Sequence, residues 1–340
     1  MRLLRVLVLM HDYMVPPEDV SGLDLMTVQW KTEHDVLTTL REMGHEVHPL
    51  GVGDDLSIVR RAVEEKKPHI VFNMMEAFHE LGTFDHNVVS YLELLRVPYT
   101  GCNPRGLMLA RNKALSKTIL HYHRIPVPEF TVVHMGRQVR RPKRLRFPLI
   151  VKSLTQEAST GIAQASVVQD DEKLAERVRF IHESIGTDAI VERYVDGREL
   201  YVGILGNQRL TVFPVWELLF TKRGDEVHRI ATDRVKWSTK YQRKYGIETS
   251  AAKLQDEAAA RRIQHLCKRV YRTLDLSGYA RIDLRMDLSG TPYVIEANPN
   301  PQLAYGEDFA ESAERVGVSY EQLLQRILLA GLQWRPERLG

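Results

Sequence analysis

A hairpin pattern near the end of the chain constrains the fold most. Residues 278–303 read GYARIDLRMDLSGTPYVIEANPNPQL. Apolar and polar side chains alternate over residues 279–286, residues 287–290 are of the types found in turns, and residues 291–297 are predicted to form a second strand. A period of two predicts half-buried strands, and the Asp and Gly between them predict a tight turn. We therefore expect a β-hairpin.

Four polar side chains fall on or just beyond these strands, namely Arg281, Asp283, Glu296 and Asn298. Two carboxylates and a carboxamide form an all-oxygen ligand set, which suits Mg²⁺, a hard cation. Arg281 adds a planar cation that can bind phosphate at two points. An ordinary charged, exposed face is the alternative, but it does not explain acidic residues two apart from Arg and Asn, followed by the Pro-Asn-Pro sequence at 299–301.

This pattern resembles the C-terminal signature of the ATP-grasp family, in particular its D-alanine–D-alanine ligase branch, whose members read aR.D followed by EvN..PG. The resemblance extends with gaps from about residue 70 to about residue 330. It implies that Asp283, Glu296 and Asn298 ligate Mg²⁺, with Mn²⁺ as an alternative. It also implies that Arg281 contacts the phosphate transferred from ATP.

Length and composition indicate a soluble globular protein. The 340 residues, 44% of them hydrophobic, are enough for two or three packed domains. A net charge of +3, from 47 basic and 44 acidic residues, is too balanced to indicate a nucleic-acid or membrane surface. Cys102 and Cys267 are too few for a disulfide framework or a zinc site, and no apolar run approaches the roughly 20 residues of a membrane span. We expect a cytoplasmic location and no membrane partner.

The first part of the chain alternates strand and helix patterns. Strands are predicted at 3–10, 45–50 and 70–73, and helices at 32–43 and about 56–66. Such alternation favours a small parallel sheet with flanking helices. No Gly-x-Gly-x-x-Gly follows the first strand, so a dinucleotide site is not expected.

Residues 73–101 end in a helix pattern and Val-Pro-Tyr-Thr-Gly, which is similar to the family's LE...PYTG. His79 and Asp85 fall where the family has HG..GED, but the flanking glycine and glutamate are missing. The resemblance implies that His79 contacts substrate. A structural or solvated His79 is the alternative, and the sequence favours neither.

Two lysines are expected to hold the ATP phosphates. Lys113 occupies the lysine position of the family's DK...K motif, with Asn112 in place of the aspartate. A lone helical lysine is usually solvated, but Lys113 and Lys152 occur together at the family's separation. Lys152 ends the apolar strand predicted at 147–152, and an inward charge on such a strand requires an anionic partner.

Residues 153–161, SLTQEASTG, are predicted to form a loop that closes over these phosphates. Its backbone amides and the hydroxyls of Ser159 and Thr160 would face the phosphate oxygens. The family has more glycine here, as in GSS.G, and this chain keeps only Gly161.

The sequence at 189–200 resembles the family's vlvE...GrE. The resemblance implies that Glu192 and Val195 contact adenine and that Glu199 accepts the two ribose hydroxyls. The alternative is a β-hairpin with a surface Asp-Gly turn at 196–197.

Two polar segments complete the pattern. Residues 137–146 carry six basic side chains, which suggest a solvated connection between domains or, less well without aromatic residues, a nucleic-acid surface. Residues 229–253 correspond to a mobile loop of the family, in which Lys236 would cover the reacting phosphate. Amphipathic helices are predicted at 256–276 and 320–332.

We therefore expect α/β and α+β units in an ATP-grasp architecture: a Rossmann-like N-terminal domain (1–109), a central lid (110–200) and a C-terminal domain with the metal site (201–335). The resemblance implies a carboxylate–amine ligase that forms an acyl phosphate and releases ADP. D-Alanine is one candidate substrate, and another amino acid, a peptide or a biosynthetic acid is another; a homodimer is compatible with the resemblance. The alternative functions are a non-catalytic ATP-binding scaffold and an ATP-grasp enzyme that uses a different nucleophile or a nucleic-acid-associated substrate.

Overall fold

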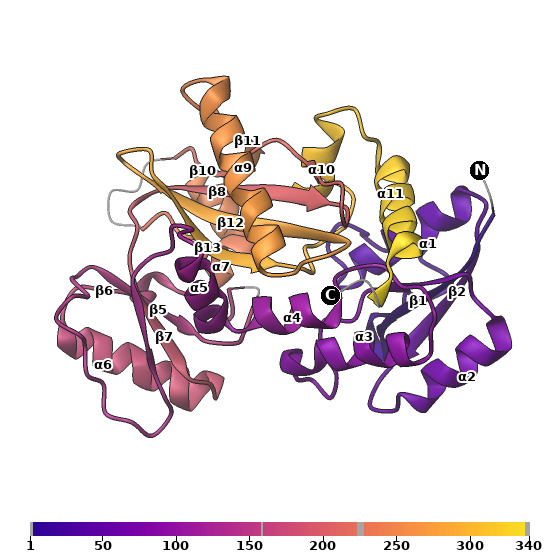
Figure 1. The fold of residues 1–340 in the computed structure, drawn as a ribbon, viewed down its shortest axis with the longest axis horizontal. Coiled ribbons are helices and arrows are strands. Elements are labelled where there is room, and N and C mark those ends of the chain that lie inside the picture. Colours follow the sequence, from indigo (N-terminus) through magenta and orange to yellow (C-terminus); the bar gives the residue numbers. More distant parts are fainter. Residues whose placement is uncertain (1–2, 158, 223–227, 337–340) are drawn as a thin grey trace.

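A computed structural model of the protein describes residues 3–157, 159–222 and 228–336. The side chains of residues 236, 237 and 239 also lie outside the description. The chain forms three sheets, and helices pack on each (Figure 1). None of the helices in the described ranges has both the length and the apolar character needed to cross a membrane.

The N-terminal unit is built on a small parallel sheet with the strand order β2–β1–β3. Its elements are β1 (Arg5–His11), η1 (Asp12–Met14), α1 (Lys31–Glu42), β2 (Glu46–Val52), α2 (Ser57–Lys66), β3 (Ile70–Asn73), η2 (Gly82–Phe84), α3 (Asp85–Leu94) and α4 (Pro104–Arg111). Val6 and Val8 of β1 share a buried cluster with α1, whereas Leu7 and Leu9 share one with α2 and α3. Both faces of β1 are therefore covered, as is usual for parallel sheets, and the predicted parallel sheet is confirmed.

The central unit is a four-stranded antiparallel sheet in the order β4–β7–β5–β6. Its elements are α5 (Lys113–Tyr122), β4 (Phe130–Val133), β5 (Leu149–Ser153), η3 (Gln164–Ser166), β6 (Val167–Val168), α6 (Asp171–Phe180), η4 (Ile181–Ile185) and β7 (Ala189–Arg193). Apolar side chains of β5 and β7, such as Val151 and Val191, form a core with Leu174 and Val178 of α6.

The basic segment 137–146 connects β4 and β5. Most of its charged side chains are exposed, so the predicted solvation is confirmed. The prediction that it joins two domains is wrong, because β4 and β5 both pair with β7 in the same sheet.

The C-terminal unit is an antiparallel sheet in the order β11–β10–β8–β12–β13, with β9 paired to β8. Its elements are β8 (Gly197–Leu205), β9 (Thr211–Val212), β10 (Trp216–Phe220), α7 (Asp233–Trp237), α8 (Thr239–Tyr245), β11 (Ile247–Ala251), α9 (Glu257–Thr273), β12 (Tyr279–Asp287), β13 (Pro292–Asn298), α10 (Asp308–Glu314) and α11 (Tyr320–Gln333). The long α9 begins after the cap residue Asp256 and buries Ile263 and Val270 in one cluster with Val202 of β8 and Ile282 of β12. Both predicted amphipathic helices are confirmed as α9 and α11.

The segment predicted as a loop at 229–253 is instead mostly regular structure, since α7, α8 and β11 occupy it. The side chains of Thr232 and Ser238 accept hydrogen bonds from Val235 N and Tyr241 N and so begin the two short helices.

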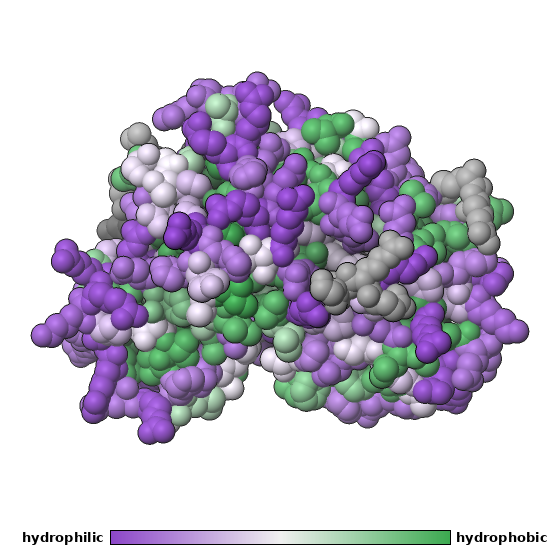
Figure 2. Space-filling model, in the orientation of Figure 1, coloured by the Kyte–Doolittle hydropathy of each residue, from purple (hydrophilic) through white to green (hydrophobic). Residues whose placement is uncertain are grey.

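The division of the chain at residues 109 and 200 stays a prediction, and α4 and β8 each cross one of these limits. β8 includes residue 200 and pairs along its whole length with β12. α11 lies beside α1 in Figure 1 and buries Leu323 and Leu324 in the cluster that also holds Val6 and Val8 of β1. The last helix thus ties the C-terminal end to the N-terminal sheet. The face shown in Figure 2 is mostly polar, with smaller apolar patches.

Candidate active site

The hairpin of β12 and β13 brings the predicted metal ligands together. Its pairing places Arg281 opposite Asn298 and Asp283 opposite Glu296. Opposite residues of an antiparallel pair project on the same face, and Asp283 and Glu296 both line one cavity. The register then shifts, so that Ile295 is an extra residue on β13. The predicted hairpin is confirmed.

This cavity encloses about 690 Å³, counting the space open to solvent. β5 and the loop after it contribute to its lining from the central unit, and β8, β12 and β13 contribute from the C-terminal unit. Predicted site residues that line it are Lys113, Lys152, Ser159, Thr160, Glu199, Asp283 and Glu296. Carboxylates and ammonium groups from two sheets therefore face one space.

Lys113 lies at the start of α5 and is buried. Its Nζ donates a hydrogen bond to Gln156 O at 2.6 Å and lies 3.6 Å from Glu296 Oε2. The neighbouring Asn112 caps the helix, because its Oδ1 accepts from Ala114 N and Leu115 N. An asparagine caps a helix as well as an aspartate does, which accounts for the departure from the family's motif.

Lys152 faces a carboxylate of the protein itself. Its Nζ donates to Glu192 Oε2 at 3.1 Å, and Lys117 Nζ lies 3.1 Å from Glu192 Oε1. The side chains of Glu192 and Lys117 are 1% exposed, whereas Lys152 reaches the cavity. Two lysines and one glutamate leave one net positive charge, and Lys152 is the member that faces the cavity.

The charges in this triad shift each other's protonation. Burial acts to raise the pKa of Glu192, but the positive charges of Lys117 and Lys152 outweigh burial and hold that pKa below its usual value. Burial lowers the pKa of Lys117. Glu192 is thus an ionised counter-ion, and a contact between Glu192 and adenine stays a prediction. Lys117 was not predicted, although its spacing of four residues from Lys113 places both lysines on one helix face.

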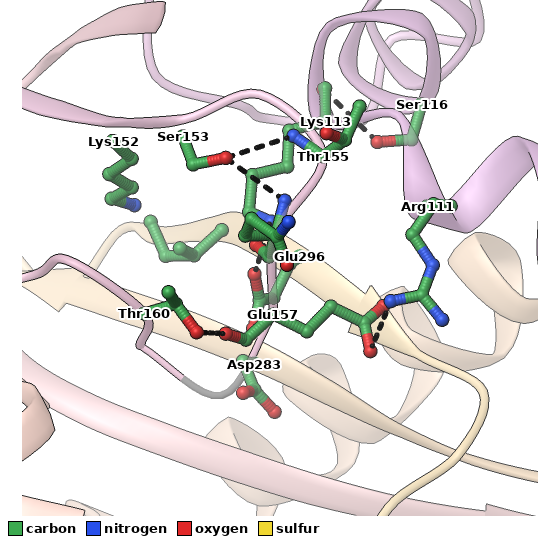
Figure 3. Close-up of polar contacts among 12 residues, drawn as sticks. Arg111, Lys113, Ser116, Lys152, Ser153, Thr155, Glu157, Thr160, Asp283 and Glu296 are labelled. Carbon is green, nitrogen blue, oxygen red and sulfur yellow. Dashed lines mark hydrogen bonds and ion pairs between the residues drawn. The ribbon is translucent and has the colours of Figure 1, made fainter. Parts of the chain in front are cut away.

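The loop that follows β5 runs along the cavity (Figure 3). Ser153 Oγ accepts from Gln156 N, and Thr160 Oγ1 donates to Glu157 O. Glu157 Oε2 lies 3.0 Å from Arg111 Nη1, and Arg111 also binds the buried Asp85 of α3. The loop is therefore anchored to the N-terminal unit. Of the three predicted phosphate contacts in the loop, Gly161 is absent from the cavity lining, and all three contacts stay predictions.

Arg281 holds Asp283 in a two-point ion pair. Its Nε and Nη2 lie 2.7 and 2.8 Å from the two carboxylate oxygens. A carboxylate keeps further lone pairs when it accepts two such bonds, so Asp283 can still ligate a cation. Asn298 Oδ1 accepts from Asn300 N.

Asp283 and Glu296 fit a hard cation, because they offer oxygen atoms to one cavity. Within the described parts of the chain, no group of three or more His, Cys, Asp or Glu side chains could hold a metal ion. The predicted ligand set of Asp283, Glu296 and Asn298 is not a group of that kind, because Asn298 supplies an amide oxygen. Metal binding by these three residues stays a prediction.

The chain passes from β7 to β8 through residues 194–196. β7 and β8 belong to different sheets, so the alternative of a β-hairpin at 196–197 is wrong. Glu199 lines the cavity and pairs with Arg285 at 3.0 Å, and Val195 O accepts from Arg285 Nε at 2.6 Å. Arg285 was not predicted. The sequence feature that could have identified Arg285 is a charged residue at an inward position in an otherwise apolar part of β12.

The cavity lining does not include five further predicted residues, namely Gly161, Glu192, Val195, Arg281 and Asn298, and it does not include His79. His79 is exposed in the turn between Phe78 and Leu81, with its ring against Phe78. Its contact with substrate stays a prediction. The side chain of Lys236 lies outside the described residues, and only its backbone, in α7, is described.

Comparison with known proteins yields a consistent set of relatives. The family model described as "D-ala D-ala ligase C-terminus" matches residues 119–329. An uncharacterized protein, y4sG of Sinorhizobium fredii, is 32% identical over 306 residues, covering 88% of this chain and 87% of the relative. A D-alanine–D-alanine ligase of Ralstonia nicotianae is 28% identical, covering 89% and 88%. The crystal structure of a D-alanine–D-alanine ligase from Bacillus anthracis complexed with ATP superposes with a TM-score of 0.75, 20% identity, and coverage of 97% and 98%. This last likeness confirms the predicted fold.

Proposed function

This chain belongs to the D-alanine–D-alanine ligase family of ATP-grasp enzymes and is an ATP-dependent ligase, and we propose that it activates a small carboxylate as an acyl phosphate and joins it to an amine. One observation carries the proposal. Asp283 and Glu296 of the hairpin share a cavity with Lys113 and Lys152. This arrangement suits a nucleoside triphosphate, because its phosphates bind both cationic side chains and metal ions held by carboxylates.

The reaction proceeds in two steps. An oxygen of the carboxylate attacks the γ-phosphorus of ATP, the bond to the bridging oxygen breaks, and ADP leaves. The amine then attacks the carbonyl carbon of the acyl phosphate, loses a proton, and expels phosphate, which carries away one oxygen of the original carboxylate. Lys113, Lys152 and Arg281 stabilise the negative charge on the transferred phosphoryl group.

Asp283, Glu296 and Asn298 would hold Mg²⁺, or Mn²⁺ in its place, and the metal would supply further positive charge at the phosphates. Glu199 faces the ribose, and Val195 lies at the adenine. Ser159, Thr160 and Gly161 contact the phosphates through their loop. Lys236 covers the reacting phosphate, and His79 contacts the substrate, in this proposal.

The substrates are small carboxylates and amines of the amino-acid type. Two of the relatives named above are D-alanine–D-alanine ligases, and D-alanine is one candidate here. The sequence after Asn298 has Gln302 in place of the family's glycine, so another amino acid or a peptide is an equal candidate. We also propose that the enzyme is cytoplasmic and that it assembles as a homodimer.

An ADP-release screen across amino acids and small carboxylates, with product masses measured, tests this function. ADP and phosphate should form only when a suitable acid is present, and hydroxylamine should trap the activated acid as a hydroxamate. Formation of AMP and pyrophosphate would contradict the chemistry. Nucleotide binding without any product, across a broad panel of acids and amines, would support the non-catalytic scaffold instead.

A further inference from the structure

Arg285 is a buried cation near the C-terminal end of β12, and all of its guanidinium nitrogens donate hydrogen bonds. Nε donates to Val195 O at 2.6 Å, and Nη2 donates to Gly197 O at 3.0 Å. Nη1 donates to Arg229 O at 2.8 Å and to Glu199 Oε2 at 3.0 Å. Of these partners, only Glu199 is charged, so it compensates the buried charge of Arg285.

These bonds join three parts of the cavity wall. Val195 and Gly197 lie where the chain passes from β7 to β8, and Arg229 immediately precedes Ile230 and Ala231, which line the cavity. Arg285 itself lines the cavity as well. A guanidinium presents its donors in a fixed plane, so Arg285 sets the positions of the other two parts relative to β12.

The same network limits what Glu199 can still bind. Oε2 accepts from Arg285 Nη1 and from Ala231 N at 3.3 Å, and Oε1 accepts from the Tyr201 hydroxyl at 3.0 Å. A carboxylate has about four acceptor positions, two on each oxygen. Among the described residues, three of these positions are taken by protein donors, and one position on Oε1 is left.

We propose that Arg285 and Tyr201 hold Glu199 so that it accepts a hydrogen bond from one ribose hydroxyl of the nucleotide and not from both. The inference rests on the proposed function, in which Glu199 faces the ribose. A nucleotide that lacks the recognised hydroxyl leaves a charged acceptor unpaired, whereas loss of the other hydroxyl leaves Glu199 unaffected. Arg285 and Tyr201 act through Glu199 and are positioning residues.

Equilibrium binding of ATP, 2′-deoxy-ATP and 3′-deoxy-ATP to the full chain, with Mg²⁺ and measured by calorimetry, tests the inference. In the wild type, one analogue should bind at least about tenfold more weakly than ATP, since a hydrogen bond to a charged group is lost. The other analogue should bind as ATP does.

Tyr201→Phe gives the sharpest variant, because it frees the second position on Oε1 and keeps the aromatic ring that Arg281 covers at 4.6 Å. Both deoxy analogues should then bind about tenfold more weakly than ATP. Tyr122→Phe, at a side chain that is 83% exposed, is the matched control and should keep the wild-type pattern.

Arg285→Lys provides a second test, since a lysine cannot reproduce the planar set of donors. The variant should bind ATP about as weakly as it binds the discriminated analogue, with the difference between them lost. Equal losses for both analogues in the wild type, or an unchanged pattern in Tyr201→Phe, would overturn the inference and leave the proposed function standing. Failure of all three nucleotides to bind would overturn both.

Discussion

Glu192→Gln is expected to destabilise the protein more than Lys152→Met, although both changes remove one charge from the same triad. Without the carboxylate, the ammonium groups of Lys117 and Lys152 remain buried, and each loses a partner that lies 3.1 Å away in the wild type. Without Lys152, the pair of Lys117 and Glu192 remains balanced. The order of the two effects therefore follows from which charges are left behind.

The magnitudes can be worked from these contacts. Removal of one partner of a buried ion pair costs about 3 to 5 kcal/mol. With an unfolding entropy of about 2.1 cal/mol/K per residue, a chain of 340 residues has about 0.7 kcal/mol/K, so Glu192→Gln should lower Tm by about 6 °C. Lys152→Met loses one hydrogen bond between charged groups, about 1.5 to 3 kcal/mol, and should lower Tm by about 2 to 4 °C.

Thermal unfolding followed by circular dichroism measures both changes, with Glu314→Gln, at an exposed position of α10, as the control. Because burial lowers the pKa of Lys117, a folded Glu192→Gln protein binds protons less readily than its unfolded chain. Its deficit in stability should therefore shrink as pH rises. Equal losses in Glu192→Gln and Lys152→Met, or a larger loss in the latter, would refute the reasoning.

Three further outcomes are expected. Glu296→Gln should lower turnover at least about a hundredfold, because a metal-binding carboxylate is lost. An unchanged melting temperature should show that the fold is kept, and full activity would contradict the assignment of Glu296 as a metal ligand. Burial raises the pKa of Glu33 to about 7, so the wild type should lose stability as pH rises from about 4.5 to 7. Glu33→Gln should remove up to about 3 kcal/mol of that loss, as measured by urea unfolding at different pH values. A parallel pH profile for the two proteins would contradict this. Arg111→Met should speed amide exchange in residues 153–161, because Glu157 loses its anchor; unchanged exchange would show that Arg111 does not hold the loop.

Local patterns in the sequence predicted the hairpin well. The alternation over 279–286 and the turn that follows it predicted two paired strands, and the structure pairs them so that Asp283 lies opposite Glu296. Buried charges were harder to predict, because their partners come from distant segments. Glu192 meets Lys117 and Lys152 only when β7 pairs with β5 and α5 packs nearby.

The rule that identified Lys152, an inward charge on an apolar strand, applies equally to Arg285 and would have identified it. The segment 229–253 was predicted as a loop from its resemblance to a mobile loop of the family, and helices as short as α7 and α8 show too little apolar periodicity to correct that prediction. Their cap residues, Thr232 and Ser238, were the available signal. The basic segment 137–146 was assigned to a domain connection, because the pairing of β4 with β7 is a contact between segments far apart in the chain.

Transfer of oxygen from the carboxylate to phosphate tests the central claim most directly. The acid identified by the ADP-release screen would be labelled with ¹⁸O at both carboxylate oxygens, and the released phosphate would be analysed by mass spectrometry. Formation of an acyl phosphate predicts phosphate with one ¹⁸O atom and an amide product that retains the other. Unlabelled phosphate, or the label in AMP, would contradict the proposed activation of the carboxylate by the γ-phosphate of ATP.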